Sequence, residues 1–109
     1  MALTEKKVAQ REMTTTLVTV YTVPDNTRLY LKTFDICNTS LFERRATVHL
    51  VPRLGAPGAG TTIVPDVEMP ARSMLQWTGL QILDDGDSIQ VVADDAGVTI
   101  NMSGAESTF

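Results

Sequence analysis

Hydrophobic and polar residues alternate most clearly near the end of the chain. In residues 88–91 and again in residues 98–102, every second residue is hydrophobic. A period of two is typical of a β-strand with one face in a core and the other in solvent. The intervening Asp94-Asp95-Ala96-Gly97 places glycine where a tight turn needs a positive φ. This pattern predicts a β-hairpin.

A second pair of strands is indicated between residues 14 and 38. Valine, threonine and aromatic residues lie on both sides of Pro24-Asp25-Asn26-Thr27. Proline fixes φ for the first turn position, and Asp-Asn favours a turn through its side-chain hydrogen bonds. The segment therefore predicts a strand, a turn and a strand, which is the pattern of an all-β protein.

Strand-forming composition continues along the chain and is broken at short intervals by Gly, Pro, Asn and Asp. The glycine-rich stretch 53–60 lacks bulky side chains and predicts a mobile surface loop. Strands are expected near residues 15–22, 28–37, 46–51, 62–67, 73–77, 88–93 and 98–103. About seven short strands predict an all-β, single-domain antiparallel β-sandwich or jelly roll.

The first thirteen residues have a different character. Thr4 to Lys7 could cap and start a short helix, but only Val8 and Ala9 offer it an apolar face. A segment that buries so little is expected to fray unless a neighbour holds it. We therefore expect an extended N-terminal arm over residues 1–13 and a β-sandwich domain over residues 14–109.

Length, charge and cysteine content exclude several classes of protein. A chain of 109 residues makes one domain, and its net charge of −4 disfavours direct binding to nucleic acid. No apolar run approaches the roughly 20 residues that cross a bilayer, so neither a membrane span nor a secretory signal is expected. Cys37 is the only cysteine, which excludes an intrachain disulfide and a C-x-x-C site.

No residue set has the spacing of a catalytic, cofactor or metal site. His49 lies in mid-strand without an evident nucleophile or acid, and Cys37 closes a strand, where a buried, inert thiol is expected. Asp84-Asp85-Gly86-Asp87 suggests a calcium loop, but a strand begins where further ligands are needed, so a turn with capping carboxylates is expected. Asp66 and Glu68 share a strand face, as a glycosidase pair or as solvated charges. We expect no enzyme activity, cofactor or metal.

Several segments together resemble a family. Tyr21-Thr22-Val23-Pro24, followed by Leu31-Lys32 and by Asp35-Ile36-Cys37-Asn38-Thr39-Ser40, resembles a pattern in small virion proteins of tailed bacteriophages. Residues 83–91 are similar to the turn into that family's penultimate strand, and residues 97–106 to its closing strand. The resemblance covers most of residues 19–106. It implies a structural virion component rather than an enzyme.

Within that class, the leading hypothesis is a capsid decoration or cement protein on the outside of the head. A charged arm is suited to ordering on a neighbouring subunit, and a thin acidic domain keeps particles mutually repelling. The expected partners are the major capsid protein or other virion proteins, together with further copies in a homo-oligomer, and the expected location is the virion, assembled in the host cytoplasm. The candidate partner-binding residues are Lys6, Lys7, Val8 and Arg11 in the arm, and Arg44, Arg45 and Arg53, which could meet carboxylates at an interface.

Two alternatives remain open. One keeps the virion but assigns the protein to the neck, collar or tail as an accessory ring. The other is a carbohydrate-binding module in which Trp77, Tyr21 or Tyr30 stacks on sugar.

Overall fold

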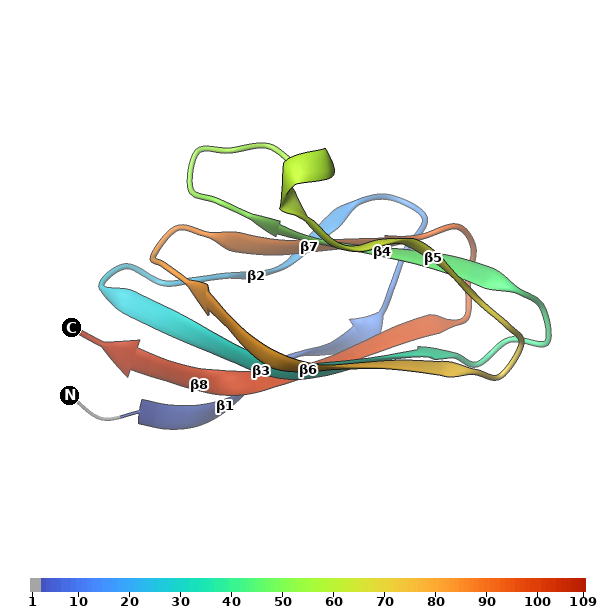
Figure 1. The fold of residues 1–109 in the computed structure, drawn as a ribbon, viewed down its shortest axis with the longest axis horizontal. Coiled ribbons are helices and arrows are strands. Elements are labelled where there is room, and N and C mark those ends of the chain that lie inside the picture. Colours follow the sequence, from blue (N-terminus) through green and yellow to red (C-terminus); the bar gives the residue numbers. More distant parts are fainter. Residues whose placement is uncertain (1–2) are drawn as a thin grey trace.

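The computed structural model describes residues 3–109 and consists almost entirely of β-strands (Figure 1). A short 3-10 turn, η1 (Ala59–Thr61), interrupts the connection between the fourth and fifth strands. The strands are β1 (Leu3–Glu12), β2 (Val18–Thr22), β3 (Thr27–Asn38), β4 (Arg44–Val51), β5 (Thr62–Met69), β6 (Met74–Leu83), β7 (Ser88–Ala93) and β8 (Val98–Thr108).

The strands form two four-stranded sheets that lie face to face (Figure 1). The first sheet has the order β1-β8-β3-β6 and the second has the order β2-β7-β4-β5, and all pairs are antiparallel. The chain crosses between the sheets after most strands, so neighbours in space are distant in sequence. This is the topology of an eight-stranded jelly roll, and it confirms the predicted fold class.

The core lies between the sheets and follows the alternation of each strand. In β3, Leu29, Leu31, Phe34 and Ile36 are buried, although Leu31 and Phe34 are three residues apart. The register against both neighbours shifts between Leu31 and Thr33. The irregularity adds one residue to the spacing and so returns Phe34 to the core face.

The N-terminal segment, expected to be an extended arm that needs a neighbour, forms a strand rather than the short helix that Thr4 to Lys7 could have started. β1 pairs with β8 from Leu3 opposite Ser107 to Glu12 opposite Thr99. Val8 within the strand and Met13 directly after it are buried. Main-chain pairing with β8 orders a segment that has few apolar side chains. The segment was expected to fray unless a neighbour held it, and that neighbour is β8 of the same chain.

Two other elements extend beyond their predicted bounds. β6 continues to Leu83 although a strand was expected over 73–77, and β8 continues to Thr108. In both strands the added residues pair with β3.

Candidate functional site

Two large apolar side chains are exposed together on the loop between β3 and β4. Leu41 is 66% exposed and Phe42 is 68% exposed. We call these two residues the apolar tip. Water contact with so much apolar surface is unfavourable, which makes the tip a candidate contact surface.

The loop that presents the apolar tip is held from beneath by Asn38. The Asn38 side chain is fully buried, and its Nδ2 donates to the main-chain oxygens of Phe42 at 2.8 Å, Met69 at 3.1 Å and Pro70 at 3.0 Å. Its Oδ1 accepts from the main-chain N–H of Ser40 at 3.0 Å and from the Ser40 hydroxyl at 2.8 Å. These bonds tie the loop to the turn between β5 and β6, so the tip is ordered before any partner arrives.

Arg44 supports the apolar tip from the side. Its Nε donates to the main-chain oxygen of Ala96 at 2.9 Å, and its guanidinium carbon lies 5.7 Å from the centre of the Phe42 ring. A cation over an aromatic face is mildly attractive. Arg44, a predicted partner-binding residue, therefore lies beside the tip and already has contacts within the chain.

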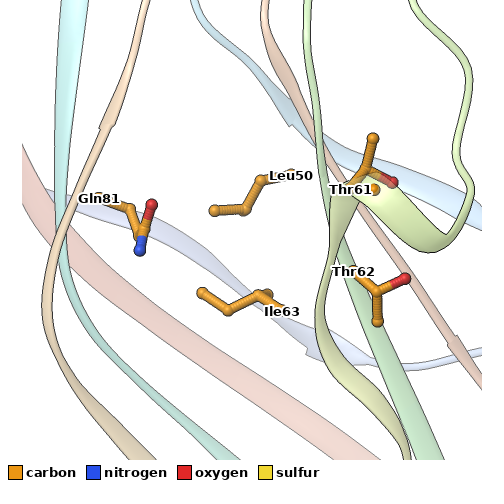
Figure 2. Close-up of a pocket in the computed structure, with 6 residues that line it drawn as sticks. Leu50, Thr61, Thr62, Ile63 and Gln81 are labelled. Atoms are coloured by element: carbon orange, nitrogen blue, oxygen red, sulfur yellow. The ribbon is translucent and has the colours of Figure 1, made fainter.

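The sandwich is open along one side, between the edge strands β5 and β6. A hollow of about 250 Å³ lies there, and Leu50 and Ile63 point across it towards Gln81 (Figure 2). A neighbouring hollow of about 200 Å³ shares Leu50 and Gln81 and also touches Ile82 and Leu83. Ligand pockets usually exceed roughly 300 Å³ and gather converging polar groups. These hollows are smaller and suit a protein contact better than a small ligand.

Lys6 is half-buried and is held by contacts within the chain where β1, β2 and β8 meet. Its Nζ donates to the Tyr21 hydroxyl at 2.9 Å and forms an ion pair with Glu106. The hydrogen bond to Glu106 raises the pKa of Lys6, and burial raises the pKa of Tyr21. Lys6 therefore connects β1 to β2 in the second sheet as well as to β8 in its own sheet.

The other predicted residues of the N-terminal segment divide between core and surface. Val8 is 7% exposed and packs in the core. Lys7 and Arg11 are exposed, with Lys7 Nζ donating to Gln10 Oε1 and Arg11 Nε donating to the main-chain oxygen of Glu12. Contact of these residues with a partner stays a prediction.

The structure does not bring the three predicted arginines together. Arg45, at the start of β4, pairs through Nε with Asp66 at 3.1 Å and through Nη1 with Glu68 at 2.8 Å, and the bond to Asp66 raises the pKa of Arg45. Asp66 and Glu68, the two carboxylates on one strand face, are therefore ion-pair partners of Arg45. Arg53 follows the other end of β4, where its side chain is exposed.

The remaining candidates have structural surroundings. His49 is half-buried, with Nδ1 2.9 Å from Thr61 Oγ1. Asp87 accepts from the main-chain N–H of Asp84 at 2.9 Å, which confirms a turn with a capping carboxylate. Cys37 is half-buried rather than buried, because it faces away from the core. Within residues 3–109 no three metal-ligating side chains come together, and no helix is long and apolar enough to span a bilayer.

Sequence reasoning missed both the apolar tip and its support. The signal lay in Asn38-Thr39-Ser40, whose residue types bond to nearby main chain, directly before two large apolar residues in a predicted connection. The partners of Asn38 lie some thirty positions away in Met69 and Pro70, so the sequence could not reveal the anchorage.

No protein-family model matches the chain, and no curated protein matches it by sequence. Two solved structures are similar in fold. A protein of Bacillus endospore appendages, described as a novel family of disulfide-linked pili, matches with 12% identity and a TM-score of 0.56, over 98% of this chain and 88% of its own. A chain of infectious bursal disease virus, Gx strain, matches with 11% identity and a TM-score of 0.56, over 96% of this chain and 31% of its own. At these identities the likeness concerns the fold alone.

Proposed function

We propose that this chain is a structural protein of a tailed-phage virion and acts as a capsid decoration or cement protein on the outside of the head. The major capsid protein is the proposed partner, no turnover is involved, and the proposed location is the virion after assembly in the host cytoplasm. The observation that carries the proposal is the apolar tip on its anchored loop.

The shape of the tip favours a macromolecular partner. Leu41 and Phe42 protrude from the end of the sandwich, so they fit a pocket on another surface better than they could enclose a ligand. Because Asn38 already orders the loop, binding costs little conformational entropy there. Buried aromatic and aliphatic anchors of this kind dominate the affinity of protein interfaces.

The fold is compatible with such a role. Jelly rolls are common in viral shells, and a chain of a viral particle is among the structures similar in fold. The resemblance of residues 19–106 to small phage virion proteins points the same way. Lys7, Arg11 and Arg53 remain on the surface as proposed secondary contacts for carboxylates of the partner.

Binding to phage heads tests the proposal. The variant Leu41→Ser/Phe42→Ser is expected to bind heads at least about tenfold more weakly than the unaltered chain, because it loses the apolar anchors. The matched control is Leu54→Ser, which alters a side chain that is 99% exposed on another loop. Equal binding by the tip variant and the control would show that the tip is not the contact.

Copy number separates the head from other positions in the virion. Quantitative peptide mass spectrometry on separated heads and tails is expected to find this chain in heads, at a level near that of the major capsid protein. A few copies per particle would support the neck, collar or tail alternative, and absence from particles would refute a virion role. Of the three rings in the carbohydrate-binding alternative, two have partners within the chain, because the Trp77 ring stacks on Phe34 at 5.1 Å and Tyr21 is bonded to Lys6.

A further inference from the structure

β6 differs from the other long edge strands because it has no charged residue over its ten positions. Exposed edges usually carry charges or prolines, or are short, because free main-chain groups invite pairing with another chain. β5 contains Pro65, Asp66 and Glu68, and the edge strand β2 has five residues. β1, the opposite edge of the first sheet, carries Glu5, Lys6, Lys7, Arg11 and Glu12. β6 lacks these protections.

The last part of β6 also exposes apolar side chains. Gln81 points into the gap between the sheets (Figure 2), so its neighbour Ile82 faces the outside, and Leu80 is exposed as well. Leu80 is 51% exposed and Ile82 is 53% exposed. The register against β3 shifts between the pairs Leu31–Gln81 and Thr33–Thr78, so Gly79 and Leu80 lie in the irregularity and the regularly paired end of β6 is 81–83.

We propose that β6 pairs with β6 of a second copy of this chain, antiparallel, about a twofold axis at Gln81. The first sheets of the two copies then join into one continuous sheet. In this register Leu80 of each copy lies opposite Ile82 of the other, and the two Gln81 residues face each other. The cross-strand pairs are apolar with apolar and amide with amide, so the strand is complementary to itself.

The absence of charge on β6 makes this strand the place where two copies of the chain can meet. The chain has a net charge of −4, so two copies repel each other over most of their surfaces. Pairing through β6 brings no charged side chain opposite another. A partner that binds through charged side chains would find no charged residue on β6. The proposal concerns self-association and does not depend on the virion role.

A charge-exchange experiment tests the proposal. The unaltered chain is expected to be a concentration-dependent dimer in sedimentation equilibrium. The variants Leu80→Lys/Ile82→Lys and Leu80→Glu/Ile82→Glu are each expected to weaken the dimer at least about 100-fold, because like charges meet across the axis. An equimolar mixture is expected to restore a dimer, since the introduced lysines then face the introduced glutamates.

The control is Leu3→Lys/Leu54→Lys, which makes the same charge change at exposed leucines away from β6 and is expected to leave the dimer intact. A monomeric unaltered chain, or dimeric lysine and glutamate variants, would overturn the proposal. If the variants do not fold, hydrogen exchange of the unaltered chain decides. Protection of amides 79–83 is expected to increase with protein concentration, and concentration-independent exchange there would also overturn it.

Discussion

Asn38 shows how one buried amide determines the shape of an exposed loop. A primary amide has two N–H donors and an acceptor oxygen. In Asn38 the amide nitrogen donates to the main-chain oxygens of Phe42, Met69 and Pro70, and the oxygen accepts from the main-chain N–H of Ser40. No apolar residue of similar size could satisfy the three main-chain oxygens that converge there. The position therefore links the core to the proposed contact surface.

Replacing Asn38 is expected to destabilise the protein and to loosen the apolar tip. Asn38→Ala should lower the free energy of unfolding by about 2–4 kcal/mol, because buried main-chain oxygens lose their donor. Asn38→Asp should be at least as harmful, because it places a carboxylate beside the oxygens of Phe42, Met69 and Pro70. Urea denaturation measures the change.

The matched control is Asn101→Ala, at an exposed position on β8, which is expected to change stability by less than about 0.5 kcal/mol. An Asn38→Ala variant as stable as this control would show that the amide does not anchor the loop.

The lysine of β1 gives a prediction about pH. The pKa of Lys6 is raised above 10.5 by its bond to Glu106, and burial raises the pKa of Tyr21 above 10.0. Both groups hold their protons more tightly when folded, so their contribution to stability is present below these values and is lost as pH rises through the raised pKa values. Thermal unfolding of the unaltered chain should therefore show a fall in stability above about pH 10.

In Lys6→Met the loss above that pH is expected to be smaller, because the lysine no longer titrates. An identical alkaline profile in the variant and the unaltered chain would exclude this role for Lys6. Lys7→Met is the matched control, since Lys7 is exposed and its side chain bonds to Gln10.

At the scale of elements, β1 closes the first sheet. It pairs along its length with β8, it contributes Val8 to the core, and Met13 follows it into the core. Its five charged residues also protect this edge from pairing with another chain. β6, at the opposite edge, also has exposed main-chain groups but carries no charged residue. One edge of the first sheet is therefore protected from pairing with another chain, and the other edge is open to it.

Deleting residues 1–13 tests whether residues 14–109 form an independent domain. The deletion removes two buried side chains and leaves the edge of β8 unpaired, so the free energy of unfolding is expected to fall by more than about 3 kcal/mol. Urea denaturation of the truncated and full chains measures the loss. An unchanged unfolding midpoint would instead support the predicted division into an arm and a separate sandwich.

At the scale of the whole molecule, the jelly roll separates its surfaces. β1 begins and β8 ends at one end of the sandwich, whereas the loop with the apolar tip lies at the other (Figure 1). The proposed self-pairing strand lies along a side edge between the two ends. A single copy can therefore present the tip to a shell and β6 to a second copy at the same time.

The local patterns of the sequence predicted most of the strands, because alternation and turn residues act between near neighbours. β7 and β8 are examples, but the predicted hairpin between them is wrong, because the two strands lie in different sheets and do not pair with each other. The pattern failed for β1, whose order comes from β8 at the far end of the chain. It also failed for the end of β6, where Leu80, Gln81 and Ile82 show a short alternation that is inverted, with the polar residue facing inward.

By itself, the sequence determined an all-β chain of one domain, the acidic turns and the lone cysteine, because these follow from residue types and spacings of a few positions. The tertiary structure decided which strands pair, that β1 belongs to the sheet, and that Leu41, Phe42, Leu80 and Ile82 remain exposed. Pairing and exposure depend on contacts between residues that are distant in the chain. Ion pairs show the same division, since the sequence contains Arg45, Asp66 and Glu68, but only folding brings β4 beside β5.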